Sequence, residues 1–171
     1  MIYFIEGPDG TGKTTLARNI AINSINNRKT CLFFHCTNRS SRKTADEDYT
    51  EFLEDLKTYK AKQYDVVIDR GWISNVVYTT VFEPEKAHIS DEVANKLFEI
   101  VDKTIVCLPK DKSRYLNHFL ELAHSRREDY IQDMDKVYDM FNVYANRFCR
   151  YDMFEHVTDH PELINVEEIN D

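Results

Sequence analysis

Long apolar runs are missing from this sequence of 171 residues. No apolar stretch approaches the roughly 20 residues that a membrane-spanning helix needs. The N-terminus leads from Met1 directly into the strand-like segment IYFIEG, without the basic region and cleavage site of a secretory signal. We therefore expect neither membrane insertion nor secretion, and we expect a cytoplasmic protein.

Closely spaced cysteine pairs and a surplus of positive charge are also missing. The four cysteines, Cys31, Cys36, Cys107 and Cys149, form no C-x-x-C pair, so reduced thiols are expected. The formal net charge of −8 argues against broad binding of a nucleic-acid polymer, because such binding needs a cationic surface that displaces counterions. A few well-placed arginines can still hold a small anion, so small-molecule nucleotides stay open as partners.

What is present is an alternation of short apolar runs with longer segments whose apolar residues recur at helical spacing. The runs cover residues 2–5, 31–34, 66–68 and 104–108. Continuous apolar strands that alternate with helices indicate an α/β protein, in which helices cover both faces of a parallel sheet. A fifth strand is expected near residues 163–166 or 154–157, with the first preferred. Without linkers or repeats, residues 1–171 are expected to form a single domain.

The segment IEGPDGTGKTT, residues 5–15, contains the complete pattern Gly-x-x-x-x-Gly-Lys-Thr between a predicted strand and a predicted helix. Glycines let backbone N–H groups turn inward around phosphate oxygens, Lys13 reaches the terminal phosphates, and the Thr14 hydroxyl ligates Mg²⁺. The start of the following helix adds partial positive charge. The residues predicted to bind the phosphates are Gly7, Pro8, Asp9, Gly10, Thr11, Gly12, Lys13, Thr14 and Thr15.

The third predicted strand, VVID, ends in Asp69, which is where a carboxylate near Mg²⁺ is expected. A guanine-nucleotide switch would need an N-K-x-D segment, but Asn95-Lys96 is followed by Leu97-Phe98 and no Asp. A motor or helicase usually needs a larger chain with a second set of motifs. Among phosphate-loop proteins, an enzyme that transfers the phosphoryl group fits this chain best.

Arginines follow the second and third predicted strands and a later helix junction. Arg39 lies in HCTNRS, Arg70 in DRGWISNVVY, and Arg126 and Arg127 in HSRRED. In an open parallel sheet, ligands bind at the carboxyl ends of the strands. Because arginine forks suit phosphate oxygens and do not deprotonate, these residues predict a second anion opposite the phosphate loop.

Together, FIEGPDGTGKTT and DRGWISNVVY resemble the thymidylate kinase and deoxynucleoside kinase superfamily of P-loop kinases. That family has a D-R-x-x-x-S-x-x-x-Y/F segment after its third strand, and Asp69, Arg70, Ser74 and Tyr78 match it position by position. The resemblance implies a three-layer P-loop NTPase fold, with a five-stranded parallel sheet, helices on both faces and a short helical lid at about residues 124–130. It also implies ATP as the phosphoryl donor.

The resemblance further implies roles for single side chains. Mg²⁺ would be held by Thr14 and Asp69, partly through water. Some family members carry a catalytic arginine directly after the loop acid, but here Asp9 is followed by Gly10, so the lid is expected to supply that charge. The expected catalytic residues are Lys13, Asp69, Arg126 and Arg127, and the expected acceptor-binding residues are Asp9, Arg39, Arg70, Ser74 and Tyr78.

The end of the second predicted strand bears on the acceptor. A nucleoside kinase needs a base near the 5′-hydroxyl, and deoxynucleoside kinases place a carboxylate there. Here the segment reads FHCTNR, with no Asp or Glu before Asp46. A monophosphate acceptor is already ionised and needs positive charge instead. We predict transfer to a deoxynucleoside monophosphate, which gives the diphosphate; the alternatives are a deoxynucleoside kinase and a non-catalytic nucleotide-binding protein.

Several features depart from the family pattern or have two interpretations. Thr79 replaces the glutamine that often follows Tyr78 and helps to read a pyrimidine, so the accepted base stays open. Trp72 and Tyr78 could stack on a base or belong to the core. The apolar stripe along residues 131–148 is interpreted as core or as the face of a homodimer.

Overall fold

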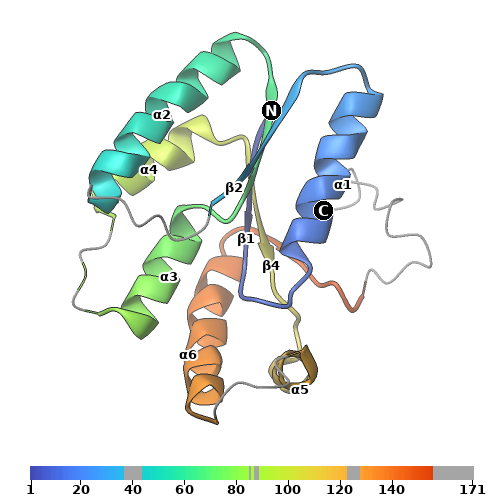
Figure 1. Cartoon of the computed structure of the whole chain (residues 1–171), viewed down its shortest axis with the longest axis vertical. Coiled ribbons are helices and arrows are strands. Elements are labelled where there is room, and N and C mark those ends of the chain that lie inside the picture. Colours follow the sequence, from blue (N-terminus) through green and yellow to red (C-terminus); the bar gives the residue numbers. More distant parts are fainter. Residues whose placement is uncertain (37–43, 85, 87–88, 123–127, 156–171) are drawn as a thin grey trace.

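The structure is a computed structural model that describes residues 1–36, 44–84, 86, 89–122 and 128–155 (Figure 1). Five strands form one sheet in the order β2-β3-β1-β4-β5, and every neighbouring pair is parallel. The strands are β1 (Ile2–Glu6), β2 (Cys31–His35), β3 (Asp65–Asp69), β4 (Lys103–Cys107) and β5 (Cys149–Tyr151). The predicted α/β class and the five-stranded parallel sheet are confirmed.

Helices cover both faces of this sheet, as predicted. The helices are α1 (Lys13–Asn26), α2 (Ala45–Ala61), α3 (Trp72–Phe82), α4 (Asp91–Ile100), α5 (Lys112–Leu122) and α6 (Glu128–Ala145). In Figure 1, α1 lies on one side of the strands, and α2, α3, α4 and α6 lie on the other. Alternate residues of β1 point to opposite faces of the sheet. Tyr3 and Ile5 pack in a hydrophobic cluster with α1, whereas Ile2 and Phe4 pack in a larger cluster with the other helices. The sheet is therefore buried on both sides, which explains its continuous apolar strands.

Local sequence signals mark where two of the helices begin. Thr44 precedes α2 and forms a capping box with Glu47, in which each side chain bonds the other's backbone N–H. Ser90 precedes α4, and its hydroxyl accepts from the N–H of Val93. In contrast, neither α1 nor α3 has a side-chain cap from its own N-cap glycine. Both of these uncapped starts lie at the site described below.

The position of the last strand differs from the prediction. The fifth strand is β5, Cys149–Tyr151, which pairs with β4. Residues 154 and 155 lie in a turn, so the second predicted location is wrong for them; residues 156–157 and 163–166 lie outside the described part. A strand of three residues, placed four residues after the end of α6, is too short to show a period of its own.

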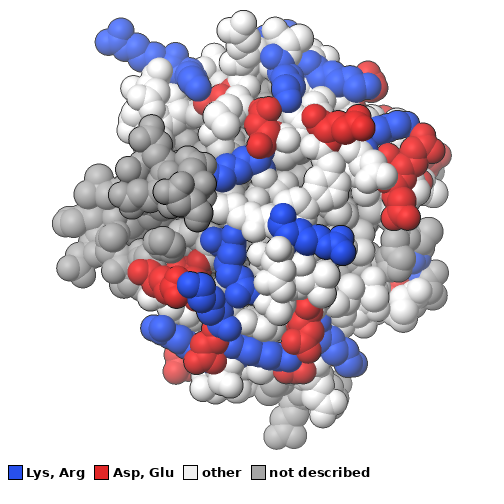
Figure 2. Space-filling model, turned by 180° about the vertical axis from the view of Figure 1, so that it is seen from behind, with Lys and Arg blue, Asp and Glu red and all other residues white. Residues whose placement is uncertain are grey.

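Charged side chains of both signs lie interspersed on the face seen from behind in Figure 2. Several described lysines pair with acids one helical turn away, as Lys57 does with Glu54 and Lys96 with Glu92. Exposed pairs of this kind contribute only a few tenths of a kcal/mol each. Among the described helices, none is long and apolar enough to cross a membrane.

Candidate functional site

The predicted phosphate loop connects the end of β1 to the start of α1, at the carboxyl edge of the sheet. Gly7 and Gly12 have φ angles of 136° and 77°, which side chains rarely adopt. A Cβ at Gly7 would lie 2.2 Å from the carbonyl oxygen of Cys107 at the end of β4. The Thr11 hydroxyl donates to the carbonyl of Pro8 over 2.8 Å and closes the turn. These constraints explain why the loop has glycine at these positions.

Lys13 is the first residue of α1 and is almost fully buried, with 5% of its surface exposed. Its Nζ donates to the carbonyl oxygen of Pro8 over 2.5 Å. Burial, with the nearby Arg70 guanidinium as a second cause, lowers the pKa of Lys13 to about 8. An ammonium group held against a neutral carbonyl inside a loop of N–H groups is poorly compensated. The loop is therefore electrostatically suited to an anion.

Asp69, the last residue of β3, is fully buried and lies beside the first turn of α1. Its Oδ2 accepts from the Thr14 hydroxyl over 2.6 Å and lies 2.7 Å from Nδ1 of His35. Its other oxygen, Oδ1, is buried and has no hydrogen-bond partner among the described residues. Buried polar atoms normally have a partner, so this oxygen indicates a site for a ligand, a cation or water. The structure thus brings together the two residues predicted to hold Mg²⁺.

Arg70 follows Asp69 in a left-handed conformation, with φ of 69°. Its guanidinium forms an ion pair with Asp9 of the phosphate loop and lies over the ring of Tyr78, 5.6 Å from the ring centroid. The Tyr78 hydroxyl accepts from the backbone N–H of Asp9 over 3.1 Å. The Nε of Arg70 is buried and has no partner in the described part of the chain. Three predicted acceptor residues therefore form one cluster next to the loop.

Ser74, the fourth member of the matched segment, is buried and turned toward Glu6. Glu6 is fully buried at the end of β1 and accepts from the N–H groups of Ile73 and Ser74, both over 3.1 Å, and from the Ser74 hydroxyl over 2.6 Å. Burial raises the pKa of Glu6, although the hydrogen bonds from Ser74 and the backbone act in the opposite direction. Glu6 thus supplies the cap that α3 lacks, and a carboxylate is favourable at a helix N-terminus.

The sequence motifs assign no role to Glu6, because its partners lie on a helix far along the chain. An acid that ends a completely apolar strand is the signal that could have found it. A second residue missed from the sequence is Asn75, whose Oδ1 is buried without a partner among the described residues. It lies on α3 between Arg70 and Tyr78 in sequence, so the unsatisfied atoms of this region come from β3 and from the start of α3.

Other predicted residues lie in the core or outside the described residues. Trp72 is 5% exposed and packs edge-on against Phe98 and Tyr144, with centroid distances of 5.0 and 5.8 Å. The stripe along α6 is core, because Met134 and Phe141 are fully buried in the larger cluster. No described residue tests the dimer. The residues that lie outside the described part are Arg39, Arg126, Arg127 and all but the last three positions of the expected lid.

Known proteins resemble this chain in sequence and in fold. No family model matches the chain. A protein of Acidianus bottle-shaped virus with the name "Putative thymidylate kinase" is 23% identical over 127 residues, which is 74% of each chain. The YorR protein of Bacillus subtilis, solved with phosphorylated GDP, has a TM-score of 0.59 at 19% identity, over 88% of this chain and 84% of its own.

A second solved structure, thymidylate kinase of Ehrlichia chaffeensis, has a TM-score of 0.52 at 13% identity, over 99% of this chain and 96% of its own. The chain is thus similar in sequence to one protein named as a thymidylate kinase and similar in fold to another. The predicted resemblance is confirmed, and so is the P-loop NTPase fold. At these identities the solved structures show the fold of this chain and not its substrates, which must be argued from its own side chains.

Proposed function

We propose that this protein is an ATP-dependent kinase that transfers a phosphoryl group to a deoxynucleoside monophosphate and gives the diphosphate. The observation that carries the proposal is the position of Arg70, a half-buried guanidinium beside the predicted phosphate loop. It is paired with a loop carboxylate and retains a buried Nε without a partner among the described residues. Such a cation next to one phosphate site supports a second anionic substrate. We further propose that residues 1–171 form one kinase domain, with a lid at about residues 124–130.

The donor end of the site is residues 7–15, which would hold the phosphates of ATP. The helix α1 begins at Lys13 without a side-chain cap, so its first N–H groups and its dipole would be available to phosphate oxygens. Lys13 would exchange the Pro8 carbonyl for a phosphate oxygen. Because its ammonium is buried, that ion pair would gain more than it would in water.

The residues present fit Mg²⁺, which prefers oxygen ligands and keeps several waters. Thr14 and Asp69 would hold it. The Thr14 hydroxyl donates its hydrogen to Asp69, so its oxygen can act as a ligand, and Oδ1 of Asp69 has no partner among the described residues. Bound there, the metal would offset the negative charge on the transferring phosphoryl group. The contribution of the chain itself is to present these two oxygens already oriented.

The acceptor end would be formed by Arg70 and Arg39, which hold the acceptor phosphate, and by Asp9, which takes a sugar hydroxyl. In the described structure Arg70 and Asp9 are paired with each other. An acceptor that carries both groups would replace this ion pair: its phosphate would pair with Arg70, and its hydroxyl would bond to Asp9. Tyr78 holds the loop backbone at Asp9, and Ser74 would contribute indirectly, through Glu6 and the start of α3.

No general base is required for this acceptor, because a monophosphate is already ionised. The reaction does require further positive charge at the transferring phosphoryl group. Arg126 and Arg127 of the proposed lid would supply it when the lid closes, as an arginine in cis does in other phosphoryl-transfer enzymes.

The second candidate function is that of a deoxynucleoside kinase. His35 favours it, since an imidazole at the end of β2 can also accept a proton.

A coupled assay of ADP release tests the proposal across a panel of deoxynucleosides and their monophosphates. We expect monophosphates to be consumed, and we expect Lys13→Ala to abolish turnover while Lys96→Ala, an exposed lysine paired with Glu92, leaves it unchanged. If nucleosides are consumed and monophosphates ignored, the acceptor assignment is wrong. If no acceptor raises ADP release above background, the protein is a nucleotide-binding protein and not a kinase.

A further inference from the structure

His35 is the last residue of β2, and neither the matched motifs nor the comparisons give it a role. The β2–β3 pairing sets His35 opposite Asp69, and its Nδ1 lies 2.7 Å from Oδ2 of that carboxylate. The same oxygen accepts from the Thr14 hydroxyl. Three elements, β2, β3 and α1, therefore meet on one oxygen atom of a fully buried acid.

The direction of these hydrogen bonds follows from the chemistry of the groups. An ionised carboxylate only accepts, so Nδ1 of His35 must carry the hydrogen. With His35 and Thr14 both donating to Oδ2, the rotation of the Asp69 side chain is fixed. Oδ1 then stays buried and unpaired among the described residues. Without His35, Thr14 would be the one described side chain left to hold the carboxylate, which could then rotate.

We infer that His35 is a positioning residue for the proposed magnesium site. It holds Asp69 so that one carboxylate oxygen orients the Thr14 hydroxyl while the other remains available to the metal or its waters. Groups that orient metal ligands in this way commonly change metal affinity by about 10- to 100-fold when they are removed. The inference rests on the proposed function in one respect, the assignment of Mg²⁺ to Thr14 and Asp69.

A purely structural role is the competing explanation, in which His35 only ties β2 to β3. The His35 side chain is 42% exposed, so it contributes little buried surface to the sheet. The two explanations differ in what they change. A structural role would lower the melting temperature and affect ADP binding equally with and without Mg²⁺, whereas a positioning role would reduce only the gain in affinity that Mg²⁺ provides.

The test measures ADP binding by titration calorimetry, in excess Mg²⁺ and in EDTA, for the full chain and three variants of His35. Phe removes the donor, Asn keeps a donor at the place of Nδ1, and Gln puts its donor nearer to the place of Nε2. For His35→Phe and His35→Gln we expect the Mg²⁺-dependent gain in affinity to fall by about tenfold or more, with affinity in EDTA within twofold of the parent. For His35→Asn we expect most of the gain to be retained.

The inference would be overturned if Mg²⁺ raised ADP affinity equally in the parent, His35→Phe and His35→Gln proteins. It would also be overturned if the ADP affinity of the parent did not depend on Mg²⁺. If His35→Phe does not fold, the Asn and Gln variants decide the question by themselves. The binding assay contains no acceptor. A protein that shows the expected Mg²⁺ pattern but phosphorylates no monophosphate would therefore refute the proposed function and leave the role of His35 standing.

Discussion

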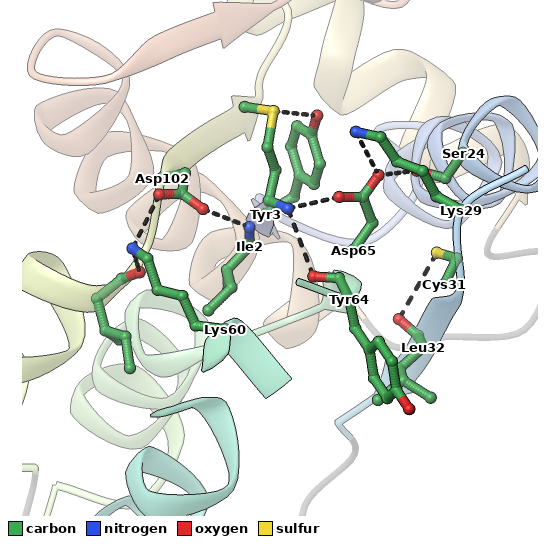
Figure 3. A network of polar contacts seen from close by, with 12 residues as sticks. Ile2, Tyr3, Ser24, Lys29, Cys31, Leu32, Lys60, Tyr64, Asp65 and Asp102 are labelled. Carbon is green, nitrogen blue, oxygen red and sulfur yellow. Dashed lines mark hydrogen bonds and ion pairs between the residues drawn. The ribbon is translucent and has the colours of Figure 1, made fainter. Parts of the chain in front are cut away.

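Two buried aspartates sit at opposite ends of one strand, and their surroundings differ. At the first position of β3, Asp65 is 3% exposed, and both of its oxygens are engaged. Oδ1 lies 2.5 Å from the chain's terminal ammonium, and Oδ2 accepts from Ser24 and lies 3.4 Å from Nζ of Lys29 (Figure 3). At the last position, Oδ2 of Asp69 has two hydrogen-bond partners, whereas Oδ1 has none within the described part of the chain.

The difference separates an acid that stabilises the fold from one that is available to a ligand. At the Asp65 end even the neighbouring acid is paired, since Asp102 accepts from the N–H of Ile2 over 2.8 Å and from Lys60 over 2.9 Å (Figure 3). Burial pushes the pKa of Asp65 upward, but its hydrogen bonds and cationic neighbours outweigh burial and lower it. At the carboxyl edge of the same sheet, in contrast, polar atoms of Asp69 and Arg70 have no hydrogen-bond partner among the residues that the structure describes.

Replacing Asp69 with Asn tests the acid at the last position of β3 and should have the largest effect on activity. The shape is kept, but the charge near the transferring phosphoryl group is lost, so we expect kcat to fall by about 100- to 1,000-fold. Steady-state kinetics at saturating ATP and acceptor measure this. A matched Asp65→Asn protein with the same loss of kcat would show that the two acids are equivalent, which would contradict the account.

Replacing Arg70 with Met should weaken the acceptor end alone. One guanidinium on a phosphate is worth about 1.5–3 kcal/mol, so kcat/KM for the acceptor should fall by roughly 10- to 100-fold. ATP affinity, measured without acceptor, should change little. Arg70→Lys keeps the charge but loses the planar fork, and we expect it to recover activity only in part. A defect confined to ATP binding would place Arg70 on the donor side instead.

Asp65→Asn should lower the free energy of unfolding by about 1.5–3 kcal/mol, because it removes the charge that accepts the hydrogen bonds of Ser24 and the terminal ammonium. Urea unfolding measures this, and kcat should stay within twofold of the parent. The pKa of Asp65 is lowered in the folded chain, so its contribution is present above about pH 4 and is lost as pH falls through the folded pKa. The parent should accordingly lose more stability on acidification than the variant.

Ser74→Ala tests whether Ser74 stabilises the fold or contacts the acceptor directly. Its hydroxyl donates to the buried Glu6 carboxylate over 2.6 Å, and a bond to a charged group is worth about 1.5–3 kcal/mol. We expect a loss of stability in that range and a KM for the acceptor within about threefold of the parent. A large rise in acceptor KM without a loss of stability would assign Ser74 to the acceptor directly.

We expect Lys13 to take up a proton when ATP binds, so that ATP affinity depends on pH. Its pKa is about 8 in the described structure, and phosphate oxygens would raise it, so ATP binding should take up part of a proton above pH 8. ATP affinity should then fall as pH rises above 8. Calorimetry in two buffers with different heats of ionisation measures the proton count. Lys13→Met should abolish it, and an unchanged count in that variant would mean that another group titrates.

The sequence allowed the first four strands and the phosphate loop to be predicted, because apolar runs and the spacing of Gly7, Gly12 and Lys13 are local patterns. It did not reveal β5, which is too short to carry a period. It also missed Glu6 and His35, whose partners lie 68 and 34 residues away. The His35 pair depends on strand register and the Glu6 pair on how α3 packs at the end of β1, and no local pattern contains either. The roles of Arg39, Arg126 and Arg127 stay predictions.

The central claim is that a new phosphate–phosphate bond forms on the acceptor, and ³¹P NMR observes that bond directly. The protein is incubated with Mg²⁺, ATP and one deoxynucleoside monophosphate, and the acceptor's phosphorus signal is followed. We expect the monophosphate resonance to be replaced by the coupled pair of a diphosphate while ATP becomes ADP. A spectrum in which ATP yields only ADP and inorganic phosphate, with the monophosphate untouched, would contradict the account.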